Sequence, residues 1–139
     1  MNVINPIKWD NSFSVNNPEI DHQHKELINV LNDKIRHCSE NKEKEREYLL
    51  KIKNPTIVLI KKHFKTEEKL LQKNNYVNIE EHKMEHESFL NKLNIIMDKL
   101  ENNLIEMDLS IIVEYMKDWL IYHIEMYDVT AKEYFKGND

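Results

Sequence analysis

The chain has 139 residues and a formal net charge of −5, with 32% charged residues, one Gly and three Pro. This length supports one domain with a single core, and the scarcity of Gly and Pro excludes a fold built on tight β-hairpins. The negative charge, without an evident basic face, argues against a dedicated nucleic-acid-binding protein.

The number of cysteines and the distribution of apolar residues indicate in which cellular compartment the protein is expected. Cys38 is the single cysteine, so an intrachain disulfide is excluded, which fits a reducing environment. The first ten residues lack a basic segment followed by an apolar run, and the longest apolar runs, such as residues 57–60, are far shorter than a membrane span. We therefore expect a cytoplasmic protein that does not insert into membranes.

The first 38 residues predict an arm followed by a helix. Residues 1–18 contain aromatic and apolar side chains without helical spacing, which indicates an extended N-terminal arm packed against the rest of the protein. Pro18 and Glu19 then indicate the start of a helix over about residues 19–38, because Pro is favoured in the first turn and Glu suits the positive end of the helix dipole. Its apolar stripe, at spacings of three and four, consists of Ile20, His24, Leu27, Leu31, Ile35 and Cys38.

The second helix is predicted over about residues 42–73. Pro55 removes one backbone hydrogen bond and crowds the carbonyl of Lys51, which predicts a kink or a short break. Glu67 occupies a core position, and an unpaired buried carboxylate is costly, so such a group is normally paired or bound to a metal. The inward stripe after Pro55 consists of Ile60, His63, Phe64, Glu67, Leu70 and Leu71.

Two further helices are predicted over about residues 79–101 and 108–135, with a turn at Asn102 and Asn103. Short connections place consecutive helices antiparallel. The sequence therefore predicts an all-α protein, an up-down-up-down antiparallel four-helix bundle with an extended N-terminal arm, as a single domain over residues 1–139.

Polar side chains at inward positions on all four helices point to a metal site. Histidines four residues apart on a helix, such as His82 and His86, project from one face and can share a metal. A single histidine in an apolar stripe is more often a hydrogen-bonded core residue, but five inward histidines with two inward acids are hard to satisfy without cations. Seven ligands exceed one tetrahedral site, so the pattern favours a dinuclear centre formed by His24, His63, Glu67, His82, His86, His123 and Asp128.

The last two of these ligands need a local change in the helix. His123 and Asp128 are five residues apart, which places them about 140° apart around an ideal α-helix. Both reach one centre if the helix widens into a π-turn there, or if Asp128 approaches from a different side; we favour the π-turn. The remaining histidines, His22 and His37, lie off the stripes and are expected to face solvent.

Five segments, in the family's order, resemble a bacterial hemerythrin. They are Trp9-Asp-Asn-Ser-Phe-Ser-Val15, Ile20-Asp-His-Gln-His24-Lys-Glu-Leu27, His63-Phe-Lys-Thr-Glu67-Glu68, His82-Lys-Met-Glu-His86-Glu-Ser-Phe89 and Trp119-Leu-Ile-Tyr-His123-Ile-Glu-Met-Tyr-Asp128. The resemblance covers nearly the whole chain. In the family a Gly commonly follows the Ser-Val of the arm, where this chain has Asn16-Asn17, and asparagine tolerates similar backbone angles.

The resemblance implies two iron ions joined by a bridging oxo or hydroxo group, which bind dioxygen reversibly for storage, delivery or sensing. It further implies that three histidines hold one iron, that two histidines hold the other and leave it an open position, and that two carboxylates bridge the pair. The three are His82, His86 and His123, the two are His24 and His63, and the bridges are Glu67 and Asp128. The positions that match the family's apolar dioxygen pocket are Leu27, Phe64, Trp119, Leu120 and Ile124.

Two other functions compete with dioxygen binding. One is a di-iron enzyme that acts on peroxide or nitric oxide, and the other is an iron-handling protein. No inward acid or base beyond the ligands is evident for proton transfer, which favours binding over catalysis. We expect a monomer or a weak homo-oligomer, and a sensing role would require a protein partner that the sequence does not identify.

Overall fold

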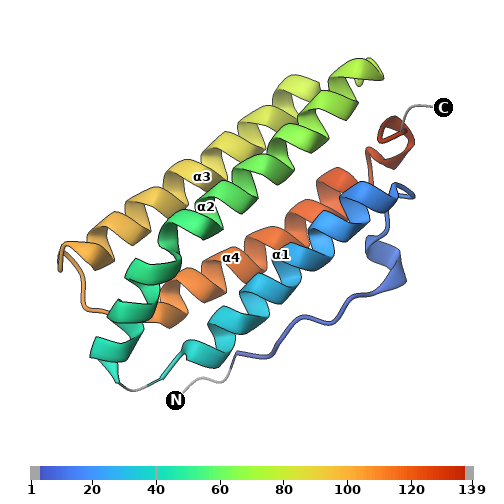
Figure 1. Cartoon of the computed structure of the whole chain (residues 1–139). Helices are drawn as coiled ribbons and strands as arrows, with labels where there is room; N and C mark the ends of the chain where they lie inside the picture. Colours follow the sequence, from blue (N-terminus) through green and yellow to red (C-terminus); the bar gives the residue numbers. More distant parts are fainter. Residues whose placement is uncertain (1–3, 40, 137–139) are drawn as a thin grey trace.

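The computed structural model describes residues 4–39 and 41–136, and all regular secondary structure in this part of the chain is helical. Helices α1 (Pro18–His37), α2 (Lys42–Lys73), α3 (Ile79–Glu101) and α4 (Leu109–His123) form an up-down-up-down bundle (Figure 1). Both α1 and α3 pack against α2 and α4. The prediction of an all-α four-helix bundle with an N-terminal arm is confirmed.

Asparagine and aspartate side chains set most of the helix boundaries. The side chains of Asn17, Asn41 and Asp108 accept hydrogen bonds from backbone N–H groups in the first turns of α1, α2 and α4. Asn75 and Asn103 follow the ends of α2 and α3 with φ angles of 56° and 57°, a left-handed conformation that asparagine adopts more readily than most residues. The chain therefore reverses direction at these two ends without glycine.

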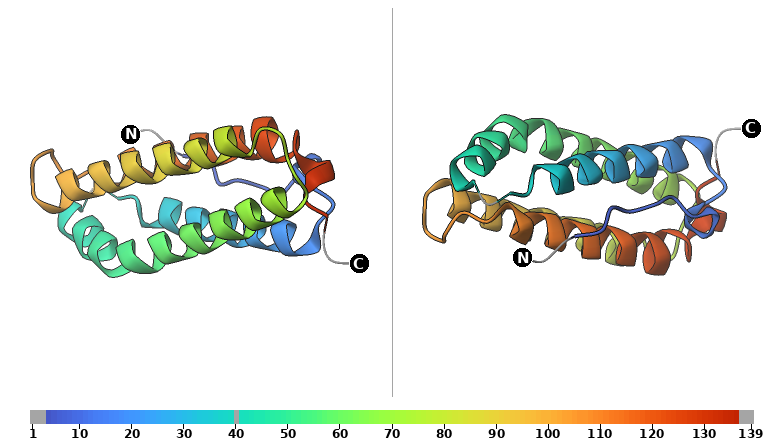
Figure 2. Two further views of the ribbon diagram at one scale, coloured as in Figure 1. Left: turned by 90° about the horizontal axis from the view of Figure 1, so that it is seen from above. Right: turned by 90° about the horizontal axis from the view of Figure 1, so that it is seen from below.

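The N-terminal arm runs along the bundle and contains one short 3₁₀-helix, η1 (Asn11–Phe13) (Figure 2). Asn32 of α1 holds the arm in place. Its side-chain oxygen accepts a hydrogen bond from the N–H of Ile7 at 2.8 Å, and its amide donates one to the Ile7 carbonyl at 2.9 Å. Before α1 begins, Asn16 has a φ angle of 59°, so asparagine occupies a left-handed position that would also suit glycine.

Helix α2 continues through Pro55 without interruption, so the short break considered from the sequence is absent. The helix instead bends in its teal-to-green part (Figure 2). Pro55 itself is exposed, whereas Thr56 and Ile60 are buried against the other helices. Packing on this inner side keeps the helix continuous, and the lost hydrogen bond is accommodated by bending.

The fourth helix differs from its predicted extent. The α-helical part ends at His123, and a π-helical turn, η2 (Ile124–Asp128), follows it. The N–H of Val129 donates to the carbonyl of Ile124 at 2.9 Å, a bond across five residues that widens the backbone. The predicted π-turn is thus confirmed. A continuous α-helix to residue 135 is wrong, because the chain tightens after η2 into turns and the 3₁₀-helix η3 (Lys132–Tyr134).

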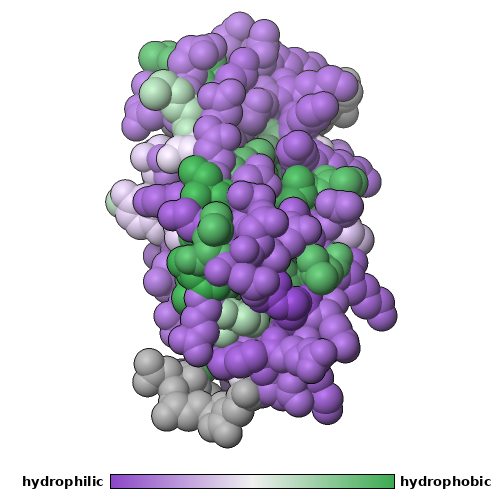
Figure 3. Space-filling model, turned by 90° about the vertical axis from the view of Figure 1, so that its left-hand side faces the viewer, coloured by the Kyte–Doolittle hydropathy of each residue, from purple (hydrophilic) through white to green (hydrophobic). Residues whose placement is uncertain are grey.

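Large exposed apolar side chains occur on α2, α3, α4 and the segments that follow them. On the side of the molecule in Figure 3, hydrophobic areas lie between hydrophilic side chains. Single exposed apolar residues are normal on folded proteins. None of the helices in the described part of the chain is long and apolar enough to cross a membrane.

A buried lysine lies beside the bend in α2. The side chain of Lys34 on α1 is 1% exposed, and its ammonium group donates a hydrogen bond to the hydroxyl of Thr56 at 2.8 Å. Burial lowers the pKa of Lys34 from 10.5 to about 8, against a smaller raising effect of the Asp33 carboxylate. The folded protein therefore holds this proton less tightly than the unfolded chain does.

Replacement of the buried ammonium, Lys34→Met, should raise the free energy of unfolding at neutral pH by about 1–3 kcal/mol, because a buried charge is exchanged for an apolar group of similar length. The gain should be constant below about pH 8 and shrink toward pH 10.5, where the lysine of the unfolded chain also loses its proton. Denaturant titrations near pH 7 and near pH 10 measure both effects. The exposed Lys51→Met is the matched control, and an equal gain at both pH values would contradict this origin.

Candidate metal centre

The seven predicted ligand side chains meet in one cluster inside the bundle, and none is more than 2% exposed. Helix α1 contributes one residue, α2 and α3 two each, and α4 with its π-helical turn the last two. In chain order they are His24, His63, Glu67, His82, His86, His123 and Asp128. His22 and His37, by contrast, are exposed, as the sequence predicts.

Glu67 lies at the middle of the cluster, with one carboxylate oxygen on each side. Its Oε2 is 3.0 Å from Nε2 of His24 and 2.8 Å from Nε2 of His63. Its Oε1 faces the Nε2 atoms of the other three histidines at 3.1–3.6 Å, namely His82, His86 and His123. This is the arrangement of a carboxylate that bridges two ions.

Asp128 also lies between the two groups of histidines, with one carboxylate oxygen near each. Its Oδ2 is 3.0 Å from Nε2 of His24, and its Oδ1 is 3.1 Å from Nε2 of both His82 and His123. The π-helical turn makes this possible, because it brings Asp128 into line with His123 on the inner side of the chain.

Glu67 is hydrogen-bonded to His24, His82 and His86, but other polar atoms of the cluster lack good hydrogen-bond geometry. Both oxygens of Asp128 and Nε2 of His63 are buried and make no hydrogen bond within the described residues, although polar atoms lie 2.8–3.1 Å away. The Nε2 atoms of His86 and His123 also face each other at 3.1 Å. Buried polar atoms without partners are costly, so these atoms fit cations placed between them.

The ligand atoms divide into two sets that each fit one ion. Within each set, atoms lie within 4.8 Å of one another; the first comprises Glu67, His82, His86 and His123, and the second His24, His63, Glu67 and Asp128. Asp128 is grouped with the second set, but its Oδ1 distances place it beside the first as well. We therefore treat both carboxylates as shared.

The charges of the two acids dominate the electrostatics of the cluster. Burial lowers the pKa of His24 and of His82, but hydrogen bonds and charge from Asp128 and Glu67 outweigh it and raise both pKa values to about 10. Burial raises the pKa of Glu67 and of Asp128, and the neighbouring histidines reverse this, so both carboxyl pKa values lie below their usual range. Without metal the acids retain histidine protons, which arriving cations would displace.

Two supporting residues could not be recognised from the sequence. Nδ1 of His63 lies 2.7 Å from Oε1 of Gln23, and Nδ1 of His86 lies 2.7 Å from Oε2 of Glu68. Both oxygens are acceptors, so each Nδ1 donates and leaves the Nε2 lone pair directed into the cluster. Gln23 and Glu68 are each adjacent in the sequence to a ligand, but this indicates a supporting role only weakly. A residue adjacent to an inward-facing one on a helix normally points away from the core.

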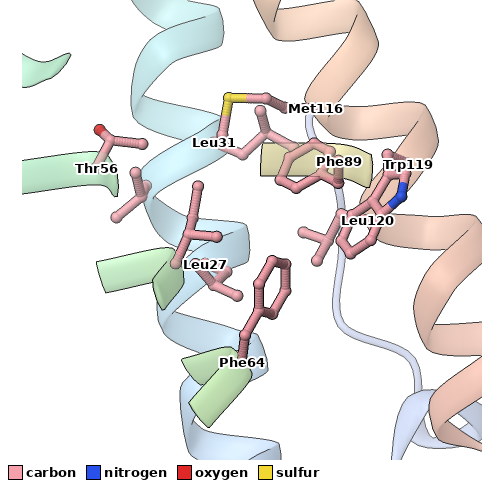
Figure 4. A pocket seen from close by; sticks show the side chains of 10 residues that line it. Leu27, Leu31, Thr56, Phe64, Phe89, Met116, Trp119 and Leu120 are labelled. Carbon is pink, nitrogen blue, oxygen red and sulfur yellow. The ribbon is translucent and has the colours of Figure 1, made fainter. Parts of the chain in front are cut away.

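An apolar cavity of about 20 Å³, enough for a molecule of about water size, lies inside the bundle (Figure 4), and two of its lining residues contact ligand histidines. Phe64 stacks on His86 with ring centroids 3.8 Å apart, and Trp119 stacks on His123 at 4.4 Å. Four of the five predicted pocket residues line it, namely Leu27, Phe64, Trp119 and Leu120. Ile124 does not: it is buried in the core, but the cavity extends along α4 in the other direction, toward Met116.

Comparison with known proteins agrees with this architecture. Residues 16–130 match the family described as the hemerythrin HHE cation binding domain. A myohemerythrin of Sipunculus nudus is 30% identical over 130 residues, which cover 94% of each chain, and a hemerythrin-like protein of Naegleria gruberi is 30% identical over 133 residues, again 94% of each. A crystal structure of a mutant protein shares the fold, with a TM-score of 0.80, 22% identity, and coverage of 94% of this chain and 98% of that one.

The four-helix bundle with its buried cluster of histidines and carboxylates thus has the form of a cation-binding domain with a binuclear metal site. The chain belongs to the hemerythrin family.

Loss of the central carboxylate should affect both ions together. Glu67→Ala removes an oxygen from each of the two ligand sets, so metal content measured by atomic emission should fall from two ions per chain to at most one. His22→Ala, one turn from Glu26 on the exposed side of α1, is the control and should keep both ions. Two tightly held ions in the Glu67→Ala protein would show that this residue is not a bridging ligand.

Proposed function

We propose that the protein holds two iron ions and binds dioxygen reversibly, without catalytic turnover. The observation that carries this proposal is the small apolar cavity, two of whose lining rings stack on ligand histidines. None of the ten residues that line it is ionisable. A site built for acid–base catalysis requires a proton donor or acceptor beside the substrate, and this cavity offers none.

The ligand set supports iron over zinc. Imidazoles and bridging carboxylates in two adjacent sets suit a pair of iron ions, whereas a single zinc ion is complete with four ligands. Three histidines would hold one iron, and His24 with His63 would hold the other, which would leave dioxygen a place to bind there. Glu67 and Asp128 would bridge the pair. Two ferrous ions supply the electrons that dioxygen takes up on binding.

The residues around the cavity keep water away from that position. Phe64 and Trp119 stack on His86 and His123, and Leu27 and Leu120 line the cavity with them (Figure 4). A dry apolar wall does not stabilise the separated charges that form when dioxygen leaves as superoxide. The wall thus favours release of neutral dioxygen and slows autoxidation.

A smaller side chain in the apolar wall of the cavity should shorten the lifetime of the oxygenated form of the protein. Leu120→Ala creates space for water beside the cluster and should accelerate autoxidation several-fold, followed as loss of the visible absorption of the oxygenated form. Ile111→Ala, at a 40% exposed position on the same helix, is the matched control. An unchanged autoxidation rate in Leu120→Ala would count against the proposed role of the wall.

The proposal itself is tested by metal analysis and visible spectroscopy of the protein, reduced without air and then exposed to dioxygen. We expect two irons per chain and a coloured form that bleaches when dioxygen is removed. Irreversible oxidation, or steady consumption of peroxide or nitric oxide, would favour a di-iron enzyme instead. Iron that is quickly lost to a chelator would favour an iron-handling protein, and zinc in place of iron would refute the proposal.

A further inference from the structure

A basic recess lies on the outer side of α2, next to the metal cluster. It is a surface hollow between α2 and α3, which lie side by side (Figure 1). Five lysines surround it, and we call this surface the lysine recess. They are Lys61, Lys62, Lys65 and Lys69 of α2 and Lys83 of α3. No basic face was evident from the sequence, because acidic residues follow these lysines closely in the chain.

The structure directs the carboxylates of Glu67 and Glu68 toward ligand histidines, away from ion pairs with the lysines. Glu67 points into the core, and Glu68 is only 27% exposed because its carboxylate is bonded to His86. Lys83 lies 3.9 Å from Glu80, and the other four lysines have no ion pair within the described residues. The recess is therefore positively charged on a protein whose net charge is −5.

Two hydrogen-bonded paths lead from the recess to the metal cluster. Glu68, on its rim, bonds directly to Nδ1 of His86 at 2.7 Å. Thr66, also on the rim, accepts a hydrogen bond from Gln23 at 3.3 Å, and Gln23 bonds to Nδ1 of His63 at 2.7 Å. One path reaches each half of the binuclear site. A lysine surface that served only solubility would not be expected to have such connections.

We propose that the lysine recess is the docking surface of an acidic electron-carrier protein that reduces the metal centre. The inference rests on the proposed function, because a dioxygen carrier whose irons have been oxidised to the ferric state no longer binds dioxygen. Each reduced carrier molecule, bearing a flavin or an iron–sulfur cluster, would give one electron and become oxidised. Two such transfers return both irons to the ferrous state, and the electrons enter through Glu68–His86 or Thr66–Gln23–His63.

Charge complementarity selects this kind of partner. An acidic protein is attracted to the recess although the whole chain is negative, because charges within about 10 Å dominate at ordinary salt concentrations. A nucleic acid or an anionic membrane would also meet the lysines, but neither uses the bonded paths to the cluster.

The test is the rate at which a small anionic reductant reduces the oxidised iron-loaded protein. With the dianionic iron(II)–EDTA complex, the rate should fall as salt is added, opposite to the behaviour that the net charge alone predicts. The triple variant K61E/K65E/K69E should slow this reaction about tenfold at low salt. K44E/K51E/K99E changes the net charge equally at exposed positions away from the recess, and it should have a much smaller effect. Circular dichroism verifies folding, and K61Q/K65Q/K69Q should give an intermediate rate.

A second measurement does not depend on electron transfer. Hexacyanochromate(III), a redox-inert paramagnetic trianion, should broaden the amide NMR signals of residues 61–69 and those around Lys83 more than those of the rest of the chain. Broadening elsewhere, or equal slowing in the two triple Lys→Glu variants, would overturn the inference. So would binding of vesicles rich in phosphatidylglycerol through these lysines without any change in reduction rate. If the chain held no iron, the proposed function would fail at the outset, before the recess was tested.

Discussion

Two carboxylates buried between five histidines are the constraint on which the rest of the structure depends. Glu67 and Asp128 each place one oxygen toward either half of the cluster, and the surrounding apolar residues exclude water. Such an arrangement is costly for a core unless cations hold it together. Each helix contributes at least one ligand, so a bound metal pair would cross-link all four helices.

Much of the fold and the cluster could be predicted because an α-helix has a fixed repeat. His24, His63 and Glu67 fall on apolar stripes, so their inward direction follows from spacing alone. On a regular α-helix Asp128 would not face the same side as His123. Because both are expected to be ligands of one site, this mismatch leads to the prediction of a π-turn. Where a regular helix fails to aim a needed side chain, the spacing of the residues alone can reveal a local distortion of the backbone.

What could not be predicted depends on contacts between distant segments. Gln23 and Glu68 support ligand histidines across a helix interface, and no local pattern marks them. The break at Pro55 did not occur because inner packing keeps α2 continuous, and Ile124 lies beyond the end of the cavity. The lysine recess arises because Glu67 is buried and the carboxylate of Glu68 is bonded to His86. These outcomes depend on contacts between helices, and the spacing of apolar residues along the sequence gives no information about such contacts.

The position of Glu67 also has a consequence for how the protein acquires its ions. Because one carboxylate serves both ligand sets, an ion in either set would fix the oxygen that the other needs and displace protons that the shared acids hold on the histidines. The second ion would then meet a site that is already ordered and has lost those protons, which would tighten its binding relative to the first. Loading would therefore be cooperative: at limiting metal the chains would divide between empty and doubly occupied forms, and singly occupied protein would stay scarce.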